Sequence, residues 1–206
     1  PIIKLKKKIL MMSFFLKYNF FKRFMDISFS ILALLLTSPI LIITSFIIKT
    51  SSKGPILFKQ TRIGLNAKQF TIYKFRTMFI TSKKSDHFNQ TFIGDKDIIP
   101  LGNIIRRLKI DEIPQFYNVL IGQMSIIGPR PCLPSTHKLM PKWALQRFST
   151  KPGITGLAQI NGGINLSWPE RWIHDKQYIK NKTFLKDLEI LIKTCHVIIF
   201  GDKKVN

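Results

Sequence analysis

The sequence has few of the residues on which disulfide scaffolds, zinc sites and several common catalytic motifs depend. Its two cysteines, Cys132 and Cys195, give neither a disulfide framework nor a CxxC pair, which favours a reducing compartment and argues against a zinc site. The four histidines form no HExxH arrangement. Neither GxGxxG nor GxxxxGK(S/T) occurs, so the sequence does not indicate phosphate binding by a Rossmann turn or a Walker loop.

Acidic residues are scarce as well. The 206 residues include 33 Lys and Arg but only 11 Asp and Glu, which gives a formal net charge of +22 and a pI near 10.3. Such a charge requires polyanionic surroundings, and nucleic acid, anionic lipid head groups and phosphorylated substrates all meet that requirement. A hydrophobic content of 45% excludes a wholly disordered chain, and the length fits one domain with an appended segment.

A long apolar run, residues 27–48, contains no charged residue. As a continuous helix it would be about 33 Å long, enough to cross a hydrocarbon core of about 30 Å. Pro39 at its centre removes a helical hydrogen bond and predicts a sharp bend, whose freed backbone groups need partners such as the hydroxyls of Thr37 and Ser38. Basic residues flank the run on both sides: Lys17, Lys22 and Arg23 before it, and Lys49, Lys53 and Lys59 after it.

These positive flanks favour the same side of a membrane, because basic segments stay on the cytoplasmic face. We therefore expect residues 23–49 to form a re-entrant helix-break-helix that breaks at Ser38 and Pro39, with a kinked spanning helix as the alternative. Residues 1–22 mix Lys with Phe, Leu and Ile, which predicts a basic interfacial segment on an anionic membrane. A disordered basic tail is the alternative for these residues.

The rest of the chain predicts a small α+β domain that is mainly helical. Apolar and polar residues alternate in PILFKQTRIG and KQFTIYKFRTM, and the turn at 64–66 between them predicts a short β-hairpin. Residues 79–99 are polar and irregular, which predicts a mobile loop. Apolar residues at helical spacing in 101–108, 168–181 and 184–200 predict amphipathic helices that suit either a core or a membrane interface.

LKIDEIPQFYN, residues 108–118, places two of the scarce carboxylates side by side, directly after a basic stretch. Asp111 could cap a helix whose first turn holds Glu112 and Pro114, because a carboxylate at a helix N-terminus accepts free backbone amides. Caps are common and catalytic pairs are rare, so this stretch alone favours a cap. Considered with the neighbouring motifs, however, the two carboxylates are better explained as a catalytic pair than as a cap.

Three motifs carry a resemblance to a known family: KFRTM at 74–78, IRRLKIDEIPQFYNVLIGQMSIIGPRP at 105–131, and KPGITGLAQINGG at 151–163. Together with the apolar run and its central Ser-Pro, they resemble the bacterial sugar transferases, the monotopic phosphoglycosyl transferases. The resemblance implies transfer of a sugar phosphate from a nucleotide diphosphate sugar, usually a UDP-sugar, to polyprenyl phosphate. It also implies a place on the cytoplasmic face of the bacterial inner membrane, with residues 50–206 as the cytosolic catalytic domain.

The same resemblance maps the family's catalytic pair onto Asp111 and Glu112. It implies that Asp111 attacks the sugar-bearing phosphorus to give an aspartyl-phosphosugar intermediate, and that Glu112 helps to hold Mg²⁺. The residue types fit this chemistry, because a carboxylate can attack a pyrophosphate only if cations neutralise the phosphates. Mg²⁺ takes one or two carboxylates with phosphate oxygens, and Arg106 and Arg130 are suited to clamp phosphates, although Arg106 also suits lipid head groups.

Other positions that match the family each have a second interpretation. Lys74 and Arg76 suit contact with substrate or head groups, or a solvated strand face. Gln159 and Asn161 suit contact with the nucleotide or the sugar, or they order their own glycine-rich loop, whose backbone is expected to approach a ligand closely. Asp175 suits a place behind the metal or an ion pair on a helix surface.

Two rival functional classes stay open at the level of sequence. A membrane-tethered module that binds nucleic acid or anionic lipid would explain the charge. No recognisable nucleic-acid motif occurs, and much of the charge lies beside apolar segments, so no nucleic-acid partner is expected. A metal-dependent pyrophosphate hydrolase would share the site and turn over without polyprenyl phosphate. Gly163 stands where the family often has arginine, and this departure leaves the sugar unassigned.

Overall fold

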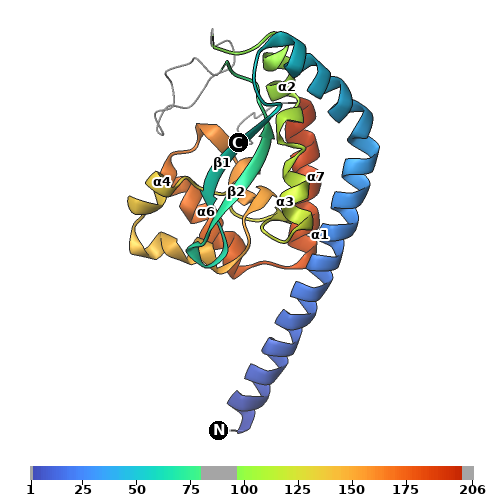
Figure 1. The fold of residues 1–206 in the computed structure, drawn as a ribbon. Coiled ribbons are helices and arrows are strands. Elements are labelled where there is room, and N and C mark those ends of the chain that lie inside the picture. Colours follow the sequence, from blue (N-terminus) through green and yellow to red (C-terminus); the bar gives the residue numbers. More distant parts are fainter. Residues whose placement is uncertain (1, 80–96, 201–206) are drawn as a thin grey trace.

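A computed structural model of the chain describes residues 2–79 and 97–200, with the backbone alone for residues 2–17. Its longest element is helix α1 (Ile2–Ser51), which bends as it passes along one side of a smaller domain (Figure 1). The elements of that domain are, in chain order, β1 (Leu57–Ile63), η1 (Leu65–Ala67), β2 (Gln69–Phe75), α2 (Gly102–Arg107), η2 (Ile110–Glu112), α3 (Gln115–Leu120), β3 (Ser125–Ile127), α4 (Pro134–Lys138), η3 (Lys142–Ser149), β4 (Gly153–Thr155), α5 (Leu157–Ile160), η4 (Gly163–Asn165), α6 (Trp168–Lys180) and α7 (Phe184–Phe200), where η denotes a 3-10 helix.

Helix α1 is continuous through Pro39, so the predicted break is wrong as an interruption of the helix. Pro39 has no amide hydrogen to donate to the carbonyl of Leu35, four residues earlier. The Ser38 hydroxyl donates to that carbonyl instead, over 2.8 Å, and Thr37 Oγ1 donates to the Ala33 carbonyl over 2.7 Å. The expected hydroxyl partners are therefore present, and they let the chain bend without leaving the helix.

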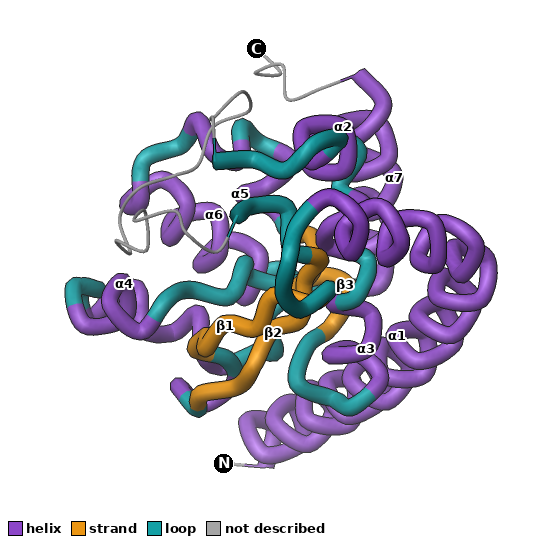
Figure 2. Tube along the Cα trace, turned by 45° about the horizontal axis from the view of Figure 1, so that its top comes forward, coloured by secondary structure: helices purple, strands orange, loops and turns teal. Residues whose placement is uncertain are grey.

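The predicted hairpin is confirmed, because β1 and β2 pair antiparallel along their whole length. A second two-stranded sheet pairs β3 and β4 in parallel, with Ser125 beside Gly153 and Ile127 beside Thr155. Figure 2 shows the strands in the middle of the domain with helices around them. The α+β class is confirmed, and the two short sheets bring together segments that lie far apart in the chain.

Among the described residues, the buried apolar side chains gather in three clusters. The largest joins β2, α3, β3, α6 and α7, and the second lies beneath η3 and α6. The third packs Ile48 of α1 against Phe75 and Ile99. The C-terminal end of α1 is therefore part of the domain core, whereas Leu36 and Ile42 in its middle are 70% and 71% exposed. Residues 18–51 of α1 are long and apolar enough to cross a membrane.

The predicted helices at 101–108, 168–181 and 184–200 correspond to α2, α6 and α7. In the apolar stripe of α2 only Ile105 is buried, while Leu101, Ile104 and Leu108 are about half exposed. This outward-facing stripe suits a membrane interface, which stays a prediction. The predicted mobile loop at 79–99 and the side chains of the basic segment up to residue 17 lie largely outside the described residues.

Candidate active site

Asp111 and Glu112 lie on the single turn η2, between α2 and α3. Lys109, just before this turn, has φ 57°, in the left-handed region that non-glycine residues seldom adopt. Helix α3 begins only at Gln115, and no side chain caps it. The capping interpretation of Asp111 is therefore wrong, and backbone amides of α3 do not occupy its carboxylate.

Glu112 is held by two basic side chains from elements far apart in the sequence. Lys74 Nζ, on β2, lies 2.8 Å from Glu112 Oε1. Arg130, in the turn after β3, donates through Nη2 to Oε1 over 2.5 Å and through Nη1 to Oε2 over 3.3 Å. The Glu112 and Lys74 side chains are 11% and 16% exposed, whereas Arg130 is 46% exposed and opens the cluster to ligands.

The two neighbouring carboxyls have opposite electrostatic environments. Burial raises the pKa of Asp111 to about 6, and the negative charge of Glu112 adds to this rise, while Lys74 and Arg106 oppose it. Burial alone would also raise the pKa of Glu112, but the positive charges of Arg130 and Lys74 outweigh it and hold that pKa well below its usual range. Carboxyl pairs whose pKa values are driven apart typically divide two chemical roles between them.

The Asp111 carboxylate has no hydrogen bond or ion pair within the described part of the chain. Three cations, Lys74, Arg106 and Lys109, are nevertheless close enough for their charges to lower its pKa. A carboxylate of raised basicity that is near cations without being paired to one is suited to attack an electrophilic centre. The structure thus places Asp111, Glu112, Arg130, Lys74 and Arg106 in one cluster.

Arg130 is fixed from behind by a buried ion pair. Arg147 Nη2 donates to the Arg130 carbonyl over 2.6 Å and lies 3.0 Å from Asp175 Oδ2. Burial raises the pKa of Asp175 to about 6, against the positive charge of Arg147. Asp175 therefore acts on the backbone that carries Arg130, and its buried partner rules out the surface ion pair that we considered.

The other predicted substrate-binding residues make bonds within the fold. Arg76 is buried and donates to two backbone carbonyls just after the end of α1. Gln159 and Asn161 each donate to a carbonyl of their own loop. At Gly153 and Gly156 a Cβ would overlap the backbone of Gly128 or its neighbours, so these two glycines permit close packing of β4 on the end of β3. The expected exposure of this backbone to a ligand is wrong at both positions.

The family described as bacterial sugar transferase matches residues 17–201. The chain belongs to this family. The transferase is 38% identical to the sugar transferase EpsL of Bacillus subtilis over 181 residues, and this match covers 88% of each of the two chains. It is 40% identical over 192 residues to a UDP-N-acetylgalactosamine-undecaprenyl-phosphate N-acetylgalactosaminephosphotransferase of Aeromonas hydrophila, and 40% identical over 182 residues to a UDP-glucose:undecaprenyl-phosphate glucose-1-phosphate transferase of Klebsiella pneumoniae. It spans only 45% and 39% of the length of these last two relatives.

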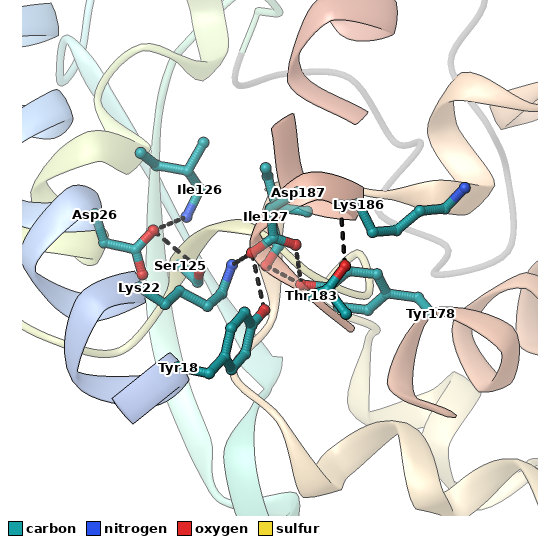
Figure 3. A network of polar contacts seen from close by, with 10 residues as sticks. All are labelled: Tyr18, Lys22, Asp26, Ser125, Ile126, Ile127, Tyr178, Thr183, Lys186 and Asp187. Carbon is teal, nitrogen blue, oxygen red and sulfur yellow. Dashed lines mark hydrogen bonds and ion pairs between the residues drawn. The ribbon is translucent and has the colours of Figure 1, made fainter. Parts of the chain in front are cut away.

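The transferase also contains a buried polar network that the sequence did not predict. Asp187 on α7 accepts hydrogen bonds from Tyr18 (2.8 Å), Lys22 (2.7 Å) and Tyr178 (2.8 Å), and Asp26 on α1 binds the backbone of β3 (Figure 3). Both aspartates belong to the small acidic set and lie in predominantly apolar helices. An acidic residue within an apolar helix was the sequence feature that could have indicated this network, because a buried carboxylate needs a specific partner.

Proposed function

We propose that this transferase moves a sugar 1-phosphate from a UDP-sugar to polyprenyl phosphate and so initiates synthesis of a bacterial glycan or glycoconjugate. The observation that carries the proposal is the contrast on one turn between Glu112, which Lys74 and Arg130 hold, and Asp111, which none of the described residues pairs. The activities for which the Aeromonas and Klebsiella relatives are named support this substrate pair.

In the first step an Asp111 carboxylate oxygen attacks the phosphorus that carries the sugar. The bond from that phosphorus to the bridging oxygen breaks, and nucleoside monophosphate leaves with the oxygen and the bonding electron pair. An aspartyl-phosphosugar intermediate remains. In the second step a phosphate oxygen of the polyprenyl phosphate attacks the same phosphorus, which forms the polyprenyl diphosphate sugar and releases the Asp111 carboxylate.

Arg130, Lys74 and Arg106 supply the positive charge that an anionic nucleophile needs in order to approach a pyrophosphate. Arg130 is half exposed, and its planar guanidinium can donate to phosphate oxygens while its backbone is fixed. Lys74 keeps Glu112 ionised and in place. The cluster therefore orients the donor and neutralises its phosphates before the attack.

Mg²⁺ is the cation that we propose for the reaction. Residues 18–79 and 97–200 contain no group of three or more His, Cys, Asp or Glu side chains that could hold a metal alone. Two adjacent carboxylates nevertheless fit Mg²⁺, which usually binds one or two carboxylates together with phosphate oxygens and water. Glu112 would help to hold it, beside Asp111 on the same turn. When bound, the cation would neutralise charge on the reacting phosphates.

We also propose that α1 enters and leaves the bacterial inner membrane on its cytoplasmic face. A straight helix over residues 27–48 would place its ends about 33 Å apart, on opposite faces of a bilayer. Before this run Arg23 and Asp26 bind the domain, and at its end Ile48 lies in the domain core. One domain can make both contacts from one face only if the run returns to that face, and the bend of α1 supports this path (Figure 1).

Intact mass spectrometry tests the proposed chemistry. The purified protein, in detergent with Mg²⁺ and without polyprenyl phosphate, is exposed briefly to UDP-glucose and to UDP-N-acetylgalactosamine. A sugar-phosphate adduct on the wild type that is missing from Asp111→Asn is the expected result. Mg²⁺-dependent transfer to polyprenyl phosphate that survives in Asp111→Asn would show that Asp111 is not the nucleophile.

A further inference from the structure

The segment of α1 that precedes the apolar run is attached to helix α3. Arg23 donates through Nη1 to the Val119 carbonyl over 2.6 Å and through Nη2 to the Leu120 carbonyl over 2.7 Å. The last carbonyls of a helix have no donor within that helix, and a positive charge there is favoured by the helix dipole. Arg23 therefore caps the C-terminal end of α3, the helix that starts three residues after Glu112.

One turn further along, α1 holds strand β3. The amides of Ser125 and Gly128 donate toward β4. The amide of Ile126 lies between them, and it donates to Asp26 Oδ1 over 3.0 Å, while Ser125 Oγ lies 3.1 Å from the same oxygen. Asp26 is buried, so it takes the place that a neighbouring strand would otherwise fill. Strand β3 ends three residues before Arg130.

These polar contacts join α1 to this side of the domain, together with ring contacts of Phe21 with Phe184 and of Phe29 with Phe116. An apolar cavity of about 90 Å³ lies between α1, α7 and β3. Lys22 and Tyr18 reach Asp187 across this region, and Tyr178 links Asp187 to the Ile127 carbonyl (Figure 3). Beside this cavity, the hydrogen bonds of Asp26 join α1 to β3.

We propose that Arg23 and Asp26 are positioning residues for the ion pair of Arg130 and Glu112, so that the seating of α1 in the membrane is linked to the geometry of the active site. Arg23 fixes the helix that follows Glu112, and Asp26 fixes the strand that leads to Arg130. The two residues are three positions apart on α1 and share one helix face, so a movement of α1 shifts both segments together. This inference rests on the proposed transfer reaction.

A double-mutant cycle distinguishes positioning from general stabilisation. Asp26→Ala removes the oxygen that accepts the hydrogen bonds from the Ile126 amide and the Ser125 hydroxyl. It is expected to lower the rate of adduct formation about tenfold, since small misplacements at a reacting centre have large effects on rate. In an Arg130→Lys background, where the paired guanidinium is already missing, the same change is expected to lower the remaining rate less than twofold. Ser28→Ala, on the exposed side of α1, is the matched control and keeps the wild-type rate.

Equal factors for Asp26→Ala in both backgrounds would overturn the inference, because they would show a loss that does not pass through Arg130. Arg23→Lys, which keeps the charge but cannot donate to two carbonyls in the same way, is expected to repeat the non-additive pattern if Asp26→Ala fails to fold. Failure of the proposed function is a different observation: the wild type itself would form no adduct, and the inference would fall with it.

Discussion

Replacing Glu112 by glutamine is predicted to shift the acid limb of adduct formation to lower pH, and also to slow the reaction. In the proposed reaction Asp111 must be ionised to attack phosphorus, and its pKa is raised from 3.8 to about 6. The wild-type rate is therefore expected to fall as the pH drops through about 6. Glutamine removes the negative charge that contributes to this rise but leaves the burial of Asp111 in place, so the pKa falls without returning to its ordinary value.

The expected shift of the limb is about one pH unit, or about 1.4 kcal/mol, because burial is the larger of the two causes. The maximal rate is expected to fall roughly a hundredfold, since Lys74 and Arg130 lose the carboxylate that holds both of them in position. The two effects are separable, because a pH profile is read from its shape and not from its height.

Single-turnover adduct formation, followed by intact mass between pH 4.5 and 8.5, measures both quantities. Asp175, like Asp111, has a pKa of about 6, and through Arg147 it supports the backbone of Arg130. Asp175→Asn is therefore the essential control. If Asp111 determines the limb, Asp175→Asn retains it at a lower rate. A limb that stays at its wild-type position in Glu112→Gln, or disappears in Asp175→Asn, would refute the reasoning about Asp111.

Three further substitutions test other contacts. Lys74→Met removes one of the cations that contact Glu112 and is predicted to slow adduct formation about tenfold. Lys59 is exposed on the same hairpin, and Lys59→Met leaves the rate unchanged. Equal rates for the two variants would exclude Lys74 from the site. Asp187→Asn disturbs the acceptor of two tyrosines and a lysine and is predicted to cost about 2–3 kcal/mol, a fall of about 5–10 °C in Tm. Glu189→Gln, which weakens two partly exposed ion pairs on α7, is the matched control and lowers Tm far less. An unchanged Tm for Asp187→Asn would contradict a stabilising network. Ser38→Ala removes the donor to the Leu35 carbonyl and is predicted to lower the free energy of unfolding by about 1 kcal/mol in a thermal unfolding assay. Thr50→Ala is the control and leaves the stability unchanged, because no proline frees a carbonyl there. Equal Tm values for the two variants would mean that the Ser38 hydroxyl does not compensate for Pro39.

The sequence was sufficient for features whose signal is local. The hairpin follows from alternation around a turn. The family resemblance singled out Asp111, Glu112 and Arg130, and Glu112 and Arg130 are in contact, while their role in catalysis stays a prediction. Pro39 shows the limit of a local rule: a missing amide predicts a break, but the adjacent Ser38 hydroxyl supplies the lost hydrogen bond and the helix continues. Which basic residue meets which acid could not be predicted, because Lys74 and Glu112 are joined only by tertiary packing across 38 positions.

The few carboxylates that this basic chain buries must all be compensated in the same way. Each buried charge needs a compensating donor or cation, and Asp26, Glu112, Asp175 and Asp187 each have one from a distant segment. Through these hydrogen bonds and ion pairs, the four carboxylates connect α1, β3, η2, α6 and α7 to other parts of the domain. Asp111 is also partly buried among cations, yet its oxygens are engaged by none of the described residues. Pairing Asp111 would lower its pKa and its basicity, so its position beside a paired Glu112 is the arrangement that the proposed attack on phosphorus requires.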